Sequence, residues 1–320
     1  MSGGNQKSAL ILVTGGAGFI GSHTVDQLLM LGYQVRVLDN LSSGKLNNLP
    51  ESGRLQFLQG DILDHKMVQA ATSGVTHVLH LAAQVSVQKS LEDPIQSCQQ
   101  NIEGFLAVLD AARKIGARIV YASSAAVYGD SVVLPIRETS PVNAISPYGL
   151  EKITNEQYAA LYTYMYGTSQ LGLRYFNVYG PRQDPTSPYS GVITKFMAMI
   201  ATGRSLTVRG DGLQERDFIH VRDAARANVS ALFSDYVGII NIARGQAITI
   251  RRLTEVMAQV LGSGVAVNYV PNIPGDIRRS VAQNRLMAKH LGRPLVTIEE
   301  GLAELMQDMP RPVLPCQSIE

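Results

Sequence analysis

The sequence predicts an α/β protein in which a doubly wound parallel sheet is followed by a smaller, mixed α/β C-terminal region. Apolar strand-like runs alternate with stretches of helical periodicity through the first half of the chain, as in sheets joined by right-handed crossovers. The first of these runs, residues 9–13, is apolar throughout, which is typical of a strand covered on both faces. Polar residues follow several of the runs, at the sheet edge where ligands of such proteins bind.

The elements are expected in the following order. Strands of the sheet are predicted at residues 9–13, 34–38, 55–58, 78–83, 119–122 and 170–176, and a further strand at 236–242 is expected to rejoin them. Two long helices are predicted at residues 94–115 and 148–166.

The composition changes near Gly180, where Pro181, Pro185 and Pro188 lie within eight residues. This predicts a loop-rich region as far as about residue 212, short helices within 249–308 and a loose tail from residue 310. We therefore expect one domain from residues 1–178 with a returning segment at about 217–248. A second, smaller domain is expected from residues 179–216 and 249–320.

Composition excludes several classes of protein. The formal net charge is +2 with 17% charged residues, so the chain has no strongly basic surface and nucleic acid is not an expected partner. Two cysteines, Cys98 and Cys316, form neither a disulfide framework nor a metal-binding pattern, and Cys98 is expected inside a helix. The polar N-terminus and the lack of any apolar run of about 18 residues predict a cytoplasmic protein without membrane partners.

A glycine-rich turn, TGGAGFIG, follows the first strand and opens a helix. The spacing of Gly15, Gly18 and Gly21 permits a tight turn and lets a pyrophosphate approach the backbone. The N–H groups at the helix start, around Phe19 and Ile20, then bind phosphate. Taken alone, the motif is equally consistent with a turn that binds nothing.

Carboxylates at the ends of the next strands favour a cofactor-binding turn over a turn that binds nothing. Asp39 ends the second strand 18 residues after Gly21, where its carboxylate can bond the adenosine ribose hydroxyls. A carboxylate there would repel a 2′-phosphate, so NAD is favoured over NADP. Asp61 and Ile62, after the third strand, are placed to meet adenine, although Asp61 could instead be a solvated turn residue.

Tyr148 and Lys152 lie one helical turn apart, and Ser124 ends a strand 24 residues earlier. A tyrosine and lysine at this spacing are often an ordinary surface pair, but here a cofactor motif accompanies them. Oxidation of an alcohol requires removal of the hydroxyl proton along with the hydride. Tyrosine, with a pKa near ~10, becomes a useful base when a lysine cation stabilises its phenolate. Ser124 can bond the same hydroxyl.

These motifs together resemble the extended short-chain dehydrogenase/reductases, and within them the UDP-sugar 4-epimerases. The resemblance rests on the glycine turn, on SSAAVYG at 123–129, on Tyr148 with Lys152, and on RYFNVYGP at 174–181. It covers residues 10–292 and implies a Rossmann-type NAD-binding domain followed by a UDP-sugar-binding domain. Further cofactor contacts are expected at Asn40, Ala82, Asn101 and Tyr175.

The resemblance also implies the reaction. The sugar is oxidised at C4, the 4-keto sugar turns over, and the hydride returns to its other face, so that NAD is regenerated in place. Relatives that dehydrate or decarboxylate carry an acid just after the serine or threonine, where this chain has Ala125 and Ala126. Epimerisation is therefore the expected chemistry.

Substrate contacts are implied in the same way. Asn177 is expected at the diphosphate or sugar, and Gly191 with Val192 along the uridine and pyrophosphate. The remaining expected contacts are Arg216 at a phosphate, Asp276 and Arg278 at the nucleotide, and Ser86 and Gln183 at the sugar. Either arginine could instead belong to a surface ion pair.

Ser280 matches a position that borders the substituent at C2 of the sugar, and its small side chain leaves room for an N-acetyl group. Alternatively, Ser280 caps a helix beginning near Val281. The favoured reaction interconverts UDP-N-acetylglucosamine and UDP-N-acetylgalactosamine, with UDP-glucose a weaker substrate. A UDP-glucuronate 4-epimerase and a non-enzymatic dinucleotide sensor remain open.

Two further expectations concern packing. His80 and His220 are expected to be packed and hydrogen-bonded rather than catalytic. The helices at 94–115 and 148–166 are expected to pair with a second copy in a two-fold homodimer. Alternatively, the tyrosines Tyr158, Tyr162 and Tyr164 only cover the sheet.

Overall fold

Seven parallel strands form the main sheet in the computed structural model, which describes residues 9–185, 191–272 and 277–307. Their spatial order is β10-β6-β5-β4-β1-β2-β3. The strands are β1 (Leu10–Thr14), β2 (Gln34–Asp39), β3 (Leu55–Gln59), β4 (His77–His80), β5 (Arg118–Ser124), β6 (Gln170–Tyr175) and β10 (Gly238–Ile242). The predicted doubly wound fold is confirmed, and the predicted late strand rejoins the sheet beside β6. β4 ends at His80, three residues earlier than predicted.

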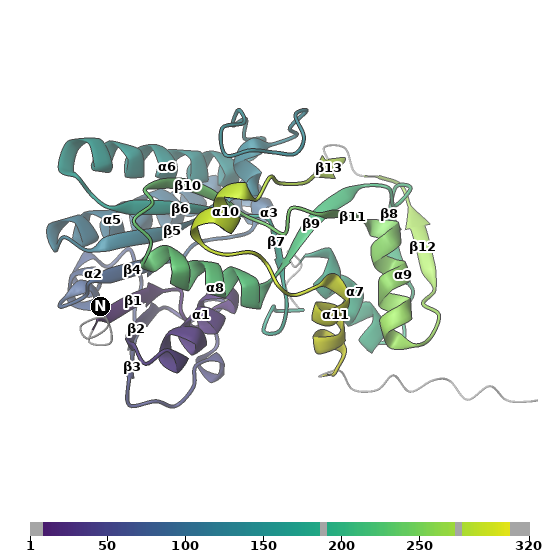
Figure 1. Cartoon of the computed structure of the whole chain (residues 1–320), viewed down its shortest axis with the longest axis horizontal. Coiled ribbons are helices and arrows are strands. Elements are labelled where there is room, and N and C mark those ends of the chain that lie inside the picture. The colour runs from purple at the N-terminus through teal and green to yellow at the C-terminus, as the bar shows by residue number, and fades with distance from the viewer. Residues whose placement is uncertain (1–8, 186–190, 273–276, 308–320) are drawn as a thin grey trace, which may run out of the picture.

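Helices cover both faces of this sheet (Figure 1). One face carries α1 (Phe19–Met30), α8 (Val221–Leu232) and α10 (Arg285–His290), and the other carries α2 (His65–Thr72), α5 (Gly104–Lys114) and α6 (Pro147–Tyr166). Ile11 and Val13 pack into the first layer and Leu12 into the second, each fully buried. Burial on both faces is the reason that β1 is apolar throughout.

The helix predicted at residues 94–115 is not continuous. After α3 (Val87–Glu92), α4 (Pro94–Cys98) is followed by a π-helical turn at Gln99–Glu103, and α5 then continues from Gly104. A π-turn inserts one residue into the helical repeat and is frequent at functional sites. Cys98 lies on a helix, as predicted, but it is exposed rather than interior, because the neighbouring Ser97 takes the buried position.

The C-terminal lobe has its own hydrophobic core. This core lies between α7 (Val192–Ala201), β8 (Leu206–Arg209), α9 (Ile250–Leu261), β12 (Val267–Val270) and α11 (Ile298–Gln307). A small sheet of β7 (Asn177–Tyr179), β9 (Glu215–His220), β11 (Ala247–Thr249) and β13 (Arg279–Ser280) lies between this lobe and the main sheet (Figure 1). Within the described residues, no helix is long and apolar enough to cross a membrane.

Two predictions for the C-terminal half are wrong. The region to residue 212 contains α7 and β8 rather than only loops, because the apolar face of α7 is buried in the lobe core. No helix begins near Val281: Ser280 ends β13, and α10 begins at Arg285. Ser280 therefore pairs in a sheet, opposite Arg216 of β9, and is not a helix cap.

Candidate active site

A cavity of about 400 Å³ opens at the carboxyl ends of the main-sheet strands. β1 lies between β2 and β4, so the loops that follow β1 and β4 leave the sheet in opposite directions at this point. The cavity, here called the glycine-turn cavity, is lined by most of the predicted cofactor residues. These are Gly15, Gly18, Phe19, Ile20, Gly21, Asp39, Asn40, Ile62, Ala82, Tyr148, Lys152 and Tyr175.

The glycine turn has the geometry that a pyrophosphate requires. Gly15 has φ +70, and a Cβ there would lie 2.7 Å from the backbone nitrogen of Ala82, so only glycine fits. A Cβ on Gly21 would collide with the carbonyl oxygen of Gly15. Gly18 is the N-cap of α1 and supplies no side-chain cap, so the first N–H groups of the helix face the cavity for an anion.

Asp39 holds the turn in place from the end of β2. Its residue is 8% exposed, and its carboxylate accepts hydrogen bonds from the N–H groups of Ala17 (2.9 Å) and Leu41 (2.8 Å). Carboxylate oxygens have lone pairs to spare, so these bonds leave capacity for ribose hydroxyls. Asn40 donates to Asp61 (2.8 Å), which lies beside the cavity, while Ile62 lines it.

Ser124, Tyr148 and Lys152 meet at this cavity from two elements. Ser124 is the last residue of β5, while Tyr148 and Lys152 lie on the first turns of α6, which Ser146 caps with a bond to the Gly149 N–H (3.1 Å). The Ser124 and Tyr148 side chains line the cavity together with Lys152, and the Ser124 hydroxyl oxygen accepts from the Ala126 N–H (3.1 Å). The Lys152 Nζ lies 5.6 Å from the centre of the Tyr148 ring. The predicted trio is thus assembled.

Burial dominates the electrostatics of this trio. It raises the pKa of Tyr148 to about 12; the nearby Ser124 hydroxyl opposes the rise, and the charge of Glu151 adds to it. Burial also lowers the pKa of Lys152 to about 8, against the charges of Glu151 and Glu156. The tyrosine therefore depends on its neighbours to lose a proton at neutral pH.

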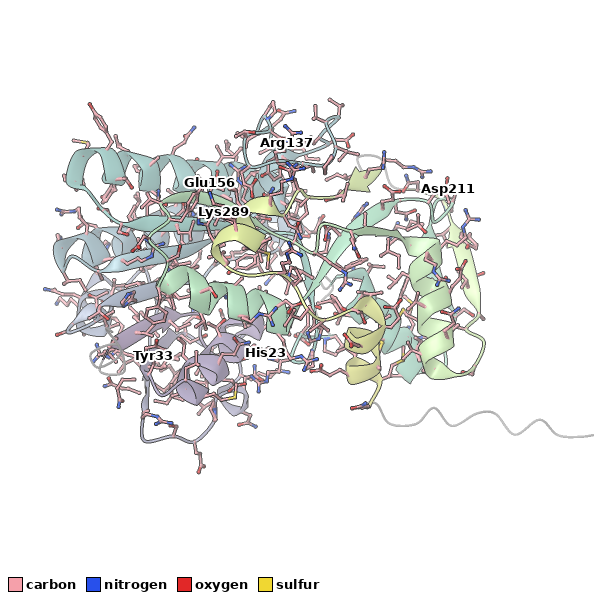
Figure 2. All side chains as sticks on the ribbon, viewed as in Figure 1. His23, Tyr33, Arg137, Glu156, Asp211 and Lys289 are labelled. Atoms are coloured by element: carbon pink, nitrogen blue, oxygen red, sulfur yellow. The ribbon has the colours of Figure 1, made fainter. Side chains whose placement is uncertain are left out.

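A buried ion pair stabilises the carboxyl end of β5 and the middle of α6. Arg174 of β6 donates to both carboxylate oxygens of Glu156, at 2.8 and 2.6 Å. Ser123 also donates to Glu156 (2.5 Å), and Tyr128 accepts from Arg174 (2.7 Å). Figure 2 shows Glu156 beneath α6, on the side of the helix that faces the sheet. The network thus fixes Ser123, which directly precedes Ser124, and Glu156, which lies one helical turn after Lys152.

Three further predicted site residues form hydrogen bonds in or next to the wall of the glycine-turn cavity. Asn101 lies in the π-turn, and its side chain bonds the backbone N–H and C=O of Gln84 (2.8 and 2.9 Å). Ser86 caps α3 through the Lys89 N–H (3.1 Å). Tyr175 lines the cavity and donates its hydroxyl proton to Asn228 (2.5 Å).

A second cavity, of about 380 Å³, lies in the C-terminal lobe and is here called the α7 cavity. It contains the predicted substrate residues Asn177, Gln183, Gly191, Val192 and Arg216. Gln183 also lines the glycine-turn cavity, as does Val178, so the two cavities meet there. Thr194 of α7 donates to the amide oxygen of Gln183.

Two cationic side chains of the α7 cavity were not predicted from the sequence. Lys195 of α7 and Arg209 of β8 join Arg216 in its lining. Neither residue stands in a motif, and the helix and strand that carry them were themselves not predicted. A lysine three residues after Val192, on an amphipathic stretch, was the available signal.

Three predicted substrate residues, Ser86, Arg278 and Ser280, are absent from the linings of both cavities. Arg278 forms a two-bond ion pair with Asp211 (2.7 and 2.8 Å), with half of its side chain exposed. Figure 2 places Asp211 at the far side of the C-terminal lobe. Ser280 is half-buried on β13. Asp276 lies outside the described residues.

The two histidines are packed, as predicted. His80 is buried and its Nδ1 bonds the Thr14 hydroxyl (2.8 Å), while burial lowers its pKa to about 3. His220 caps α8 through the Arg222 N–H (3.3 Å) and is 1% exposed. Among the described residues, no cluster of His, Cys, Asp or Glu could hold a metal ion.

The glycine turn, the acid that ends β2 and the Ser–Tyr–Lys trio define a dinucleotide-dependent enzyme that acts on an alcohol. The chain belongs to the NAD dependent epimerase/dehydratase family, whose model matches residues 11–243. A relative described as a putative UDP-glucose 4-epimerase, from Methanocaldococcus jannaschii, is 38% identical over 304 residues, which cover 94% of this chain and 98% of the relative.

Solved structures agree with this assignment. UDP-N-acetylglucosamine 4-epimerase from Methanobrevibacter ruminantium matches with a TM-score of 0.91 and 38% identity, covering 95% of this chain and 100% of that one. Thermus thermophilus UDP-glucose 4-epimerase, solved with NAD, matches at a TM-score of 0.85 and 39% identity over 93% and 98% of the two chains. The predicted class, an NAD-dependent UDP-sugar 4-epimerase, is confirmed.

Proposed function

We propose that the enzyme interconverts UDP-N-acetylglucosamine and UDP-N-acetylgalactosamine, and UDP-glucose and UDP-galactose more weakly. The observation that carries this proposal is the meeting of the two cavities at Gln183, beside the Ser124–Tyr148–Lys152 trio. A nucleotide held in the α7 cavity would place its sugar at that junction. The similarity to a solved UDP-N-acetylglucosamine 4-epimerase supports the N-acetylated substrate.

The residues of the trio would move the proton of the sugar 4-hydroxyl. Tyr148 takes that proton as the base, and Lys152 stabilises the resulting phenolate by its positive charge. Ser124 bonds the same hydroxyl and fixes its direction toward Tyr148. A bound NAD would supply the acceptor for the C4 hydride and the donor for its return. The glycine turn and Asp39 would hold its pyrophosphate and ribose.

The residues after Ser124 favour epimerisation over elimination. Ala125 and Ala126 begin a short 3₁₀ turn and carry no proton-transfer group. A dehydratase or decarboxylase would need an acid or base here to act at C5 or C6. With none, the 4-keto sugar can only be reduced again.

Cationic side chains of the α7 cavity would hold the diphosphate. Arg216, Lys195 and Arg209 all line it, and no carboxylate does so among its described lining residues. Arginine forks suit phosphate oxygens. A UDP-glucuronate would also need a cation near C6, but among the described residues that line the glycine-turn cavity Lys152 is the one cationic side chain.

The proposal includes a two-fold homodimer. An apolar stripe runs along the outer face of α6 at Leu150, Tyr158, Leu161 and Met165, between 36% and 59% exposed. Ile95 of α4, 73% exposed, adds to the apolar surface of this layer. Such a surface on a helix pair suits a second copy of the chain. A single-chain mass by light scattering at micromolar concentration would contradict the dimer.

The function is tested by incubating the enzyme with UDP-N-acetylglucosamine, UDP-glucose and UDP-glucuronate in turn, and by resolving the products chromatographically. We expect 4-epimers of the first two, with the N-acetylated sugar converted faster. Conversion of UDP-glucuronate alone would transfer the assignment to a glucuronate epimerase. NAD binding without turnover of any sugar would indicate a sensor.

A further inference from the structure

A buried carboxylate stands next to the catalytic lysine and has no part in the proton transfer described above. Glu151 directly precedes Lys152 on α6 and is 4% exposed. Glutamate is rarely buried unless its charge is compensated by hydrogen bonds or by a cation. The contacts of Glu151 therefore indicate what this charge does in the active site.

Both hydrogen bonds to Glu151 come from the interrupted helix. Its Oε2 accepts from the Ser97 hydroxyl (2.9 Å) at the end of α4 and from the Asn101 amide (2.5 Å) in the π-turn. Both donors are almost completely buried, at 1% and 2% exposure. The π-turn thus aims Asn101 at α6, a direction that an unbroken helix would not provide.

Asn101 connects this carboxylate to the wall of the glycine-turn cavity. Its amide bonds both backbone groups of Gln84, and the Gln84 side chain donates to Ser97 (3.2 Å). The residues on either side of Gln84, Ala83 and Val85, line the cavity. A second hydrogen bond joins α6 to the π-turn: the Asn155 side-chain amide donates to the Asn101 carbonyl oxygen (2.9 Å).

Among the charged groups around Lys152, Glu151 differs from Glu156 in its pairing. On α6, Lys152 is flanked by Tyr148, Glu151 and Glu156; β4 contributes the buried, neutral His80. Glu156 is already paired with Arg174 at 2.6 Å. Within the described part of the chain, no cation forms an ion pair with Glu151, so its negative charge acts on Lys152.

We propose that Glu151 is a positioning residue, whose carboxylate fixes α6 to the Gln84 loop through Ser97 and Asn101 and whose charge sustains the cation of Lys152. The inference rests on the proposed roles of Tyr148 and Lys152. Glu151 exchanges no proton in this scheme; its charge and its two hydrogen bonds are both required.

The decisive variant is Glu151→Gln, which keeps an oxygen for both hydrogen bonds and removes the charge. Loss of a negative charge lowers the pKa of Lys152 further below about 8, and it lowers the pKa of Tyr148 as well. Both limbs of the kcat-against-pH profile should therefore move to lower pH, by about one unit. At pH 8, where Lys152 is then mostly neutral, kcat should fall about five-fold, while NAD affinity measured by calorimetry stays within a few-fold of wild type.

Glu255→Gln is the matched control, because Glu255 lies on α9 with half of its side chain exposed. Its profile should coincide with that of the wild type. Glu151→Asp keeps the charge on a shorter side chain, so its limbs should stay in place while kcat falls. If Glu151→Gln does not fold, Glu151→Asp provides the test. A shift of its kcat-against-pH limbs by one pH unit would overturn the proposal.

A purely structural role predicts a different outcome. In that case Glu151→Gln lowers kcat at every pH and leaves both limbs where the wild type has them, which would also overturn the proposal. Absence of epimerisation by the wild-type enzyme would instead refute the proposed function, and the two failures are thus distinguishable.

Discussion

The two cavities of this enzyme are built in different ways. The glycine-turn cavity has walls of close-packed backbone and buried charge: Gly15 touches the Ala82 backbone, and Asp39 and Lys152 are almost completely buried. The α7 cavity is lined by half-buried or exposed cations, Arg216, Lys195 and Arg209. The first geometry is rigid and specific for one ligand shape, while the second binds through adaptable side chains.

This difference matches the two ligands of an epimerase. A cofactor that is regenerated in place has no need to leave, so a preorganised cavity is advantageous. The substrate must enter and leave in every cycle, and exposed cations hold a diphosphate without enclosing it. Substitutions should accordingly be most costly in the glycine-turn cavity and progressively milder toward the C-terminal lobe.

The largest effect is expected for Tyr148→Phe. The ring remains packed and the base is lost, so kcat should fall by about 10²–10⁴-fold while NAD still binds. Steady-state kinetics together with calorimetric NAD titration measure both quantities. Retention of more than half of the activity would show that another group is the base.

The same contrast governs what the sequence could predict. Gly15, Asp39, Ser124, Tyr148 and Lys152 are identifiable because local periodicity places each at a strand end or on a helix start, and the sheet topology brings strand ends together. These residues needed no knowledge of side-chain packing.

Other site features depend on contacts between distant segments. Asn101 donates a hydrogen bond to Glu151, 50 residues later in the chain, from a π-turn that no sequence pattern predicted. α7, which carries Lys195, begins with β-branched residues after an uncapped glycine, so its start resembles a loop or strand. Its helical state is fixed by burial against the lobe core.

The next effect in size is expected for Gly15→Ala. Alanine at φ +70 costs about 1–2 kcal/mol, and its Cβ would lie 2.7 Å from the Ala82 nitrogen. The turn must shift away from the β4 loop, so NAD affinity should fall by one to two orders of magnitude. Gly53→Ala is the control, since a Cβ there meets nothing within 4 Å. Unchanged NAD affinity in Gly15→Ala, measured by calorimetry, would contradict this reading of the turn.

A smaller effect, confined to substrate binding, is expected for Arg216→Leu. Loss of one cation beside a diphosphate should raise the KM for UDP-sugars by about ten-fold or more and leave NAD affinity unchanged. Arg252→Leu, on the exposed face of α9, removes an equal charge outside both cavities and should leave KM unaltered. Equal KM values for the two variants would remove Arg216 from the substrate site.

The most selective effect is expected for Ser280→Tyr, because it should fall on one substrate and spare the other. Ser280 lies on β13 opposite Arg216, and it is half-buried, so a larger side chain must extend over its surroundings. If this position borders the C2 substituent, tyrosine crowds an N-acetyl group and spares a hydroxyl. Conversion of UDP-N-acetylglucosamine should then fall about ten-fold or more, with UDP-glucose turnover kept or improved. Ser280→Ala is the control for loss of the hydroxyl alone and should leave the ratio of the two activities unchanged. Equal losses of both activities in Ser280→Tyr would indicate disturbance of the β13–β9 pairing, and would remove Ser280 as a determinant of substrate choice.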